Sequence, residues 1–284
     1  CSRVHSFTAW EGNAVLDKAY QSRNSYGVNA YAEIQFAKPD TDKKEVSQLF
    51  KRAAEHDPLC PCAINNFAYC LHYGIGLNKN VKEAMDYYKR AISEGCIAAA
   101  RNLGILLMKG DEESGIQPNL EEANKYLKMA VDCNDPEAIY EYANNLVNGV
   151  PQDPKKAAEL LALGVKLKNP LCMRLYGELL IRGNGVDQNA EEGAKLIKEA
   201  ADLGDPKACQ MYGYLLENGI GVPKNPEEAL KYYKKAAESG DPEAKEQYEK
   251  LLKKKEEGAT ETKDAQDPAN AVPTTEQSAC CLLI

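Results

Sequence analysis

The stretch that decides the fold, residues 204–241, reads GDPKACQMYGYLLENGIGVPKNPEEALKYYKKAAESGD. A helix is expected to begin at Asp205, because an aspartate followed by a proline supplies an N-cap and a favourable first helical residue. Small and apolar residues then recur at helical spacing as far as Gly219. Asn225, with an acid three positions later, caps a second helix that Gly240 closes. The stretch therefore predicts a helical hairpin.

The same hairpin recurs along the chain. A small residue, which we call the anchor, opens the first helix of each copy, and in five copies a glycine lies 11 positions after it. The anchors are Ala63, Ala99, Ala138, Cys172, Ala208 and Ala244, at intervals of 36, 39, 34, 36 and 36 residues. The variation lies in the loop between the two helices, because loops tolerate insertions and helices do not. The chain is therefore predicted to stack five full hairpins.

The recurring pattern joins Ala-x-x-x-Tyr/Leu-Gly-x-x-Leu, a Gly-x-Gly-Val loop and Glu-Ala-x-x-Tyr-Tyr-x-x-Ala-Ala-x-x-Gly-Asp-Pro. Over about residues 60–254 it resembles the Sel-one-like repeat (SLR) family, which is related to tetratricopeptide arrays. A tetratricopeptide unit has about 34 residues, whereas the usual interval here is 36. The resemblance implies an all-α fold, a right-handed α-solenoid of stacked helical hairpins with degenerate caps. It also implies a non-catalytic adaptor that holds other proteins together.

The chain divides by pattern into three segments. They are a weakly patterned N-terminal segment (1–46), the solenoid (47–254) and a disordered tail (255–284) that ends in a C-a-a-X-like box. In the first segment we expect helices over 13–21 and 28–36, and residues 45–55 resemble the second helix of an earlier, degenerate unit. The tail is rich in Glu, Thr, Asp, Ala and Pro without periodicity, a composition typical of disorder.

The composition excludes several classes of function. The net charge of -8 and the pI near 5.2 argue against a nucleic-acid partner. A hydrophobic content of 44% and a mean hydropathy of -0.52 suit a soluble helical protein, and no apolar run approaches the ~20 residues of a membrane span. The ten cysteines form no matched pair within a repeat, and no N-glycosylation sequon is present. This pattern favours a reducing cytosol.

Candidate catalytic and metal-binding groups are scarce. Cys60, Cys62, Cys70 and His72 form the only cluster of metal-ligating residue types, but their Cys-Pro-Cys spacing departs from the two-residue gap of structural zinc sites. No phosphate-binding, dinucleotide or hydrolase motif is present, and turns between helices explain the glycine loops. We expect no metal, cofactor, small-molecule substrate or catalysis. Cys172, at an anchor position, is expected to be a small core residue.

The C-terminal residues carry a modification motif. Cys281 stands fourth from the end and is followed by two leucines, as in a C-a-a-X prenylation box. A single lipid chain gives weak membrane binding, so a second signal is expected, and Cys280 is the candidate palmitoylation site. The tail therefore predicts a lipid-anchored protein, peripheral on the cytoplasmic face of a membrane.

Protein partners are expected on the first helices, which line the concave side of SLR arrays. Positions two and six after each anchor lie outside the packing pattern and share one helix face. The predicted partner-binding residues are Asn65, Tyr69, Arg101, Ile105, Tyr140, Asn144, Arg174, Glu178, Gln210 and Tyr214. A solvated face without a ligand is the alternative interpretation of the same residues.

The resulting hypothesis is an SLR adaptor, tethered by its C-terminus, that recruits or regulates a membrane-associated protein of unknown identity. Its layout is similar to that of the fungal chitin-synthase regulatory proteins, which also join such repeats to a prenylated end. One alternative is a soluble or endoplasmic-reticulum-lumenal quality-control adaptor of the same family without a lipid anchor. Another is a mature bacterial lipoprotein, which would begin with a cysteine such as Cys1.

Overall fold

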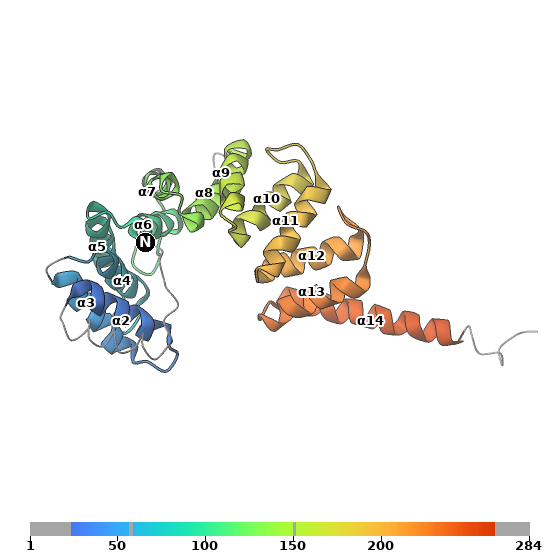
Figure 1. Cartoon of the computed structure of the whole chain (residues 1–284), viewed down its shortest axis with the longest axis horizontal. Helices are drawn as coiled ribbons and strands as arrows, with labels where there is room; N and C mark the ends of the chain where they lie inside the picture. Colours follow the sequence, from blue (N-terminus) through green and yellow to red (C-terminus); the bar gives the residue numbers. More distant parts are fainter. Residues whose placement is uncertain (1–23, 57–58, 150–151, 265–284) are drawn as a thin grey trace, which may run out of the picture. The chain divides into compact units, whose positions relative to one another are not determined.

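The computed structural model describes residues 24–56, 59–149 and 152–264, the last nine of them by their backbone alone. The expected helix over 13–21 and the tail cysteines lie outside these residues. Within them the structure is all α-helical and contains no β-strand (Figure 1). The helices are α2 (Ser25–Ala37), α3 (Lys43–Glu55), α4 (Pro61–Tyr73), α5 (Val81–Ser93), α6 (Ile97–Lys109), α7 (Leu120–Asp132), α8 (Pro136–Asn148), α9 (Pro154–Lys166), α10 (Pro170–Arg182), α11 (Ala190–Asp202), α12 (Pro206–Asn218), α13 (Pro226–Glu238) and α14 (Pro242–Asp264).

The helices stack as consecutive hairpins in two compact units, Cys1–Cys172 and Met173–Ile284, which we call unit 1 and unit 2. In unit 1, α2 packs on α3, α4 on α5, α6 on α7 and α8 on α9, and each hairpin packs on the next (Figure 1). In unit 2, α12 packs on both α11 and α13, and α13 packs on α14. The all-α solenoid predicted from the repeats is therefore confirmed. An additional hairpin, α2 and α3, precedes the first full repeat and begins upstream of the predicted boundary at residue 47.

The helix starts follow the predicted capping chemistry. In each full repeat the second helix has an asparagine or aspartate N-cap whose side-chain oxygen accepts a hydrogen bond from the backbone amide three positions on. These N-caps are Asn80, Asn119, Asp153, Asn189 and Asn225. The first helices α8 and α12 are capped by Asp135 and Asp205, whereas Cys60 and Cys96 occupy this position in α4 and α6. Local sequence therefore fixes where each helix begins.

Small residues let the two helices of a hairpin approach closely. All the anchors, Cys172 included, are completely buried, which confirms their core role. In the five full repeats the residue five positions after the anchor is again alanine or glycine, and a Cβ at Gly104 would lie 2.7 Å from Leu127 of the second helix. At Gly213 a Cβ would lie 2.9 Å from the Tyr233 ring. Large residues of the second helices thus pack directly against the backbone of the first helices.

In two repeats the second glycine of the Gly-x-Gly loop joins the hairpin to the one before it. Gly76 has φ +71, and a Cβ there would lie 2.0 Å from the carbonyl oxygen of Lys43, the first residue of α3. Gly221 repeats this geometry in unit 2, with φ +67 and 2.0 Å to the carbonyl oxygen of Ala190, the first residue of α11. Both the positive φ and the close approach require glycine.

At the C-terminal end, α14 continues past the predicted start of the tail at residue 255, as far as Asp264. The position 11 residues after the anchor Ala244 holds Lys255 rather than a glycine, so nothing stops the helix there. The i,i+4 ion pair Glu246–Lys250 supports the part of α14 before residue 255, with 2.6 Å between Oε1 and Nζ. Beyond it the helix enters the segment whose composition suggested disorder, and it ends at Asp264.

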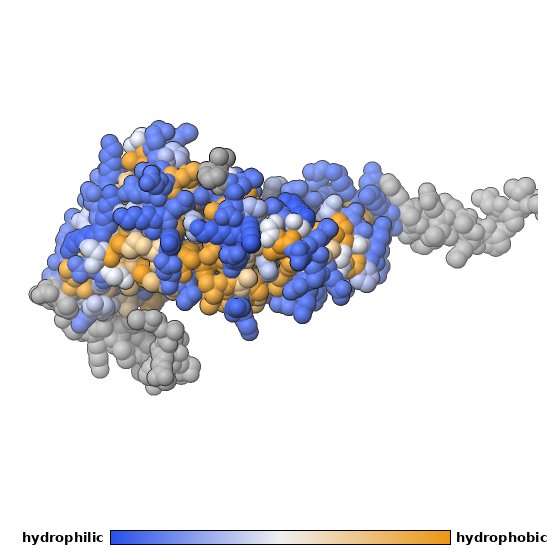
Figure 2. Space-filling model, turned by 90° about the horizontal axis from the view of Figure 1, so that it is seen from above, coloured by the Kyte–Doolittle hydropathy of each residue, from blue (hydrophilic) through white to orange (hydrophobic). Residues whose placement is uncertain are grey.

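None of the described helices has both the length and the apolar content needed to cross a bilayer. Hydrophobic residues reach the surface in patches bordered by hydrophilic side chains (Figure 2). The large exposed hydrophobic residues of the described part of the chain are Tyr26, Ile34, Tyr73, Leu120, Met129, Leu167, Leu203 and Tyr214.

Replacing Gly221 by alanine is expected to destabilise the chain more than replacing Gly204. Gly204 has φ +94 but open space around it, so alanine there carries only the left-handed backbone penalty of about 1 kcal/mol. Gly221→Ala adds a collision with the backbone at the start of α11, which cannot move independently of that helix. We expect the free energy of unfolding to fall by about 3 kcal/mol in total. Urea unfolding, monitored by circular dichroism, measures the free energy of unfolding of both variants. Equal shifts of the two midpoints would contradict the docking role of the loop.

Candidate functional site

In unit 1 the predicted partner face carries a chain of side-chain amides across α2, α4 and α6. Asn102 Nδ2 donates to Asn65 Oδ1 at 2.9 Å, and Asn65 Nδ2 donates to Asn66 Oδ1 at 3.2 Å. Asn66 Nδ2 in turn donates to Asn29 Oδ1 at 3.0 Å and to Glu33 Oε1 at 2.9 Å. Asn65 is buried within this chain. The chain of amides therefore connects three successive first helices, α2, α4 and α6.

An aromatic group lies next to the amides. Tyr69 is half-buried, with ring centroids 6.5 Å from Phe36 of α2 and 4.6 Å from Tyr73 one turn further along α4. Tyr73 is exposed. The other predicted residues of unit 1 are also half-buried, namely Arg101, Ile105, Tyr140 and Asn144. The predicted face of unit 1 thus combines a polar chain with aromatic rings, and Tyr69 lines a small cavity of about 110 Å³ together with Glu33, Phe36, Phe50 and Asn66.

Arg101, two positions after its anchor, binds the start of the following repeat. Its Nη1 lies 2.9 Å from Asp135 Oδ2 and 2.8 Å from Glu137 Oε2. Asp135 also caps α8 by accepting from the amide of Ala138 at 2.9 Å. The arginine therefore fixes the N-terminus of the next first helix.

In unit 2 the predicted residues come together in one cleft. Arg174, Glu178, Gln210 and Tyr214 line a cavity of about 380 Å³ formed by α10, α12 and α14. The same cavity is lined by Lys207, Met211, Glu243 and Gln247. The residues at positions two and six of α10 and α12 thus border one concavity. We call this cavity, with the eight lining residues just named, the first-helix cleft.

The floor of the first-helix cleft is held by a buried ion pair. Arg174 Nε donates to Asp205 Oδ2 at 2.7 Å, and the two residues are only 8% and 6% exposed. Asp205 Oδ1 caps α12 by accepting from the amide of Lys207 at 3.0 Å. Arg174 Nη1 also reaches Glu178 Oε1 at 3.4 Å. Opposite charges with little solvent are costly to separate, so the pair holds Arg174 in its place in the lining of the cleft.

The cleft offers groups suited to peptide recognition. Tyr214 is 50% exposed and presents a ring at its wall. Gln247 Oε1 is buried without a hydrogen-bond donor among the described residues, and a buried acceptor of this kind gains from an incoming N–H. Lys207 and Glu243 place opposite charges on the exposed rim. This combination can hold a short amphipathic segment by one ring contact and a few polar contacts.

Sequence reasoning missed half of the cleft residues. Lys207 and Glu243 precede their anchors by one position, and Met211 and Gln247 follow theirs by three. Positions −1, +3 and +6 are three or four residues apart, so they lie on the same face of a first helix as the predicted residues. Extending the helical spacing in both directions from positions two and six would have found these four residues.

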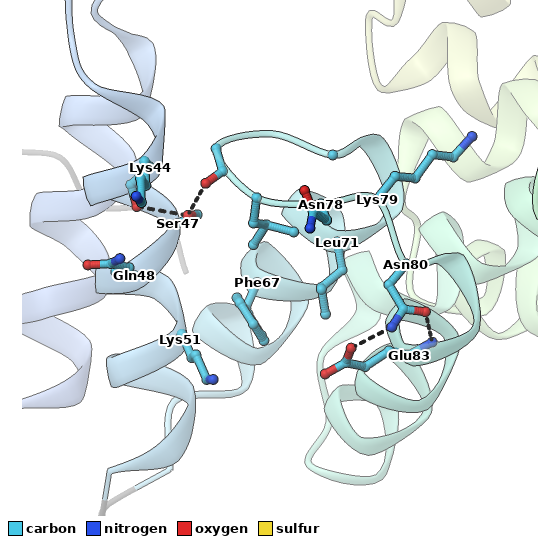
Figure 3. A pocket seen from close by; sticks show the side chains of 13 residues that line it. Lys44, Ser47, Gln48, Lys51, Phe67, Leu71, Asn78, Lys79, Asn80 and Glu83 are labelled. Atoms are coloured by element: carbon cyan, nitrogen blue, oxygen red, sulfur yellow. Dashed lines mark hydrogen bonds between the residues drawn. The ribbon is translucent and has the colours of Figure 1, made fainter.

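A different hollow recurs where the Gly-x-Gly loop docks on the preceding repeat. In unit 1 it measures about 880 Å³ and lies between α3 and the loop after α4 (Figure 3). Lys51 from α3 faces Phe67, with 6.0 Å from Nζ to the ring centroid. Ser47 Oγ lies 3.4 Å from the carbonyl oxygen of Gly76 and so connects the two walls. An equivalent hollow of about 520 Å³ beside Gly221 in unit 2 indicates that the feature belongs to repeat packing.

The cysteine and histidine cluster considered for a metal does not converge. Cys60, Cys70 and His72 are buried and Cys62 is exposed, and within the described part of the chain no three potential ligands gather around one point. Burial raises the pKa of the Cys70 thiol to about 11 and lowers the pKa of His72. The His72 ring stacks on Tyr73 with centroids 4.1 Å apart. Cys60, Cys70 and His72 therefore belong to the packing around α4, and Cys62 lies on its surface.

The contribution of the ion pair is measured by Asp205→Asn, because asparagine keeps the N-cap and removes the charge. We expect a loss of about 2 kcal/mol in the free energy of unfolding, since the buried Arg174 loses the carboxylate charge that lies 2.7 Å from its Nε. The matched control is Asp241→Asn. Asp241 caps α14 through the amides of Glu243 and Ala244, and its replacement should cost less than about 0.5 kcal/mol. Equal losses in urea unfolding would contradict a special role for the arginine pair.

Comparisons with known proteins agree with this architecture. The Sel1 repeat model matches residues 63–96, 97–135, 136–169, 170–205 and 206–241. Among solved structures, the chain is similar to c5321, a protective antigen of uropathogenic Escherichia coli with an SLR fold (21% identity, TM-score 0.67, 85% of this chain and 51% of that one). It is also similar to a Sel1 repeat protein from Oxalobacter formigenes (25% identity, TM-score 0.60, 71% of this chain and 83% of that one).

Among curated proteins, the chain is similar to Chitin synthase regulatory factor 2 of Schizosaccharomyces pombe. The two are 26% identical over 137 residues, which is 45% of this chain. The chain spans only 26% of that relative's length. The similarity therefore concerns the repeats and leaves most of the relative unmatched.

Proposed function

Because the chain belongs to the Sel1 repeat family, we propose that it is a non-catalytic scaffold that binds a partner protein in the first-helix cleft of unit 2. The observation that carries this proposal is the convergence of Arg174, Glu178, Gln210 and Tyr214 on one concavity. Variable side chains on a constant helical frame allow one fold to acquire a specific ligand without new backbone structure.

The chemistry of the cleft defines the segment it suits. A peptide with an apolar or aromatic side chain packs against the Tyr214 ring, and a peptide N–H donates to Gln247 Oε1. Lys207 and Glu243 on the rim select the charges of flanking residues. The buried Arg174–Asp205 pair needs no change on binding, so little conformational entropy is lost by the cleft.

We further propose that the partner is membrane-associated and that lipid on Cys281, with Cys280 as a second acylation site, brings the scaffold to the cytoplasmic face of the same membrane. The C-a-a-X spacing supports this part of the proposal. The name of the yeast relative describes that protein as a regulatory factor of chitin synthase. A regulator of a membrane-associated protein is the kind of molecule in which a lipid anchor raises the local concentration of the scaffold.

Binding in the cleft predicts a specific effect of Tyr214→Ala. Peptides are selected against the full chain from a displayed random library, and their Kd is measured by fluorescence anisotropy. Loss of the ring should weaken binding about tenfold, or about 1.4 kcal/mol, because exposed aromatic side chains in concave sites are typical binding hot spots.

The matched control is Tyr26→Ala, because Tyr26 is 53% exposed, close to the value for Tyr214, and lies on α2 of unit 1. This variant should bind the selected peptides like the wild type. Peptides that lose affinity with Lys51→Ala and keep it with Tyr214→Ala would instead place recognition in the hollow beside the Gly-x-Gly loop.

The lipid proposal predicts that Cys281→Ser releases the chain from membranes. In eukaryotic cells the wild type should fractionate with membranes and show the mass increment of a prenyl group, and Cys281→Ser should be cytosolic and unmodified. Cys280→Ser should keep the prenyl mass but bind membranes more weakly, because one lipid chain gives marginal binding. An unmodified, cytosolic wild type would favour the soluble adaptor without a lipid anchor.

A further inference from the structure

The last hairpin carries a hollow that resembles the two hollows beside the Gly-x-Gly loops. It measures about 390 Å³ and lies between the start of α13 and the middle of α14 in unit 2. In all three hollows the second residue of a helix forms part of the lining, namely Lys44 of α3, Glu191 of α11 and Glu227 of α13. We call the hollow between α13 and α14 the end hollow.

The end hollow lacks the loop that lines the other two. Gly76 and Leu77 line the hollow in unit 1, and Gly221 and Val222 line the one beside α11. In both, the docking glycine is followed by an aliphatic residue and stands 13 positions after its anchor. The last repeat has Glu257 at this position, and α14 continues through it. Within the described part of unit 2, no such loop therefore docks on the start of α13.

The wall that the loop would cover is apolar. Pro226 and Leu230 of α13 and Leu251 of α14 line the end hollow. Leu251 is buried, Leu230 is half-buried and Pro226 is exposed. The apolar surface therefore reaches solvent, and an apolar segment that covers it gains free energy by removing it from water.

The charged residues of the end hollow favour an acidic segment. Lys254 Nζ lies 3.7 Å from Glu217 Oε1, and Lys255 Nζ lies 2.7 Å from Glu227 Oε1. Lys224 also lines the hollow. Three lysines and two glutamates therefore leave one positive charge in excess, which complements a ligand of negative charge.

The C-terminal segment of the same chain has the matching composition. Residues 265–284 contain two acids, Asp267 and Glu276, and no lysine or arginine. Residues 282–284 are Leu, Leu and Ile. The segment therefore combines a negative charge with aliphatic side chains of the kind that the loops place in the other hollows.

The segment is also long enough to reach the end hollow. Asp264, the last residue of α14, lies nine residues after Lys255, or about 14 Å along the helix. Residues 265–281 can span as much as about 60 Å when extended. The chain can therefore return along α14 and place residues 282–284 in the hollow.

We propose that the end hollow is the docking site of residues 280–284 of this same chain, with the side chains of residues 282–284 against Leu230 and Leu251. The segment takes the place that a loop of the following repeat holds in the other hollows. Docking covers Cys281 and withholds it from a modifying enzyme. The proposal concerns the unmodified chain, so it does not depend on lipid at Cys281.

The test is photo-crosslinking of the full chain, produced in bacteria without lipid. Benzoylphenylalanine replaces Leu230 in one variant. In the control it replaces Leu203, which follows α11 and is 56% exposed. After irradiation and proteolysis, position 230 should give an adduct with the peptide that contains residues 280–284, and position 203 should give none. Serine at all three of the positions 282–284, which leaves the described helices unchanged, should abolish the adduct.

A mixture of ¹⁵N-labelled and unlabelled chains identifies the origin of the docked segment. Adducts within one isotopic form are expected. Adducts that join labelled and unlabelled chains would show that a second copy occupies the hollow and would overturn docking within the chain. Absence of any adduct with residues 280–284 from position 230 would overturn the proposal as well.

A second measurement follows the protection of the tail thiols. Iodoacetamide should alkylate Cys281 about threefold more slowly in the wild type than in Leu230→Lys, because a short tether holds the segment at a millimolar effective concentration. The matched control Leu203→Lys should react like the wild type, and circular dichroism verifies that both variants are folded. Equal alkylation rates in the wild type, in Leu230→Lys and in the chain with serine at positions 282–284 would contradict docking.

Discussion

The packing of a loop glycine against the first carbonyl of the preceding second helix is the constraint on which the rest of the structure depends. At Gly76 and at Gly221 the backbones approach so closely that no side chain fits between them. At these two loops the contact fixes how the hairpin packs on the second helix before it. Equivalent positions of successive first helices fall on one face, and a cleft can form from residues about 36 positions apart.

The N-caps of the first helices α8 and α12 add a second connection between repeats. Asp205 accepts a hydrogen bond from a backbone amide of α12 and simultaneously binds Arg174, so one carboxylate stabilises a helix start and a repeat interface. Asp135 does the same for α8 and Arg101. Cys96 holds this position in α6 in place of an aspartate.

Repeat number, helix starts and the buried anchors could be predicted because each depends on residues within one hairpin. The hydrogen bond of Asn65 and the ion pair of Arg101 could not be predicted. Their partners Asn102 and Asp135 belong to the next first helix, and no pattern within a single helix reveals them. The first-helix cleft was predicted only in part, since side-chain burial decides which of the residues on one face border a cavity. The end of α14 could not be predicted either, because residues 255–264 have a composition typical of disorder and the helix nevertheless runs through them.

The most direct test of the scaffold proposal is in-cell photo-crosslinking from the first-helix cleft. A photoreactive benzoylphenylalanine replaces Tyr214 in one variant and Tyr26 in another, and adducts are identified by mass spectrometry after irradiation. The account predicts a discrete adduct with one membrane-associated protein from position 214 and none with that protein from position 26. The same adduct from both positions, or adducts from position 26 alone, would contradict recognition in the cleft.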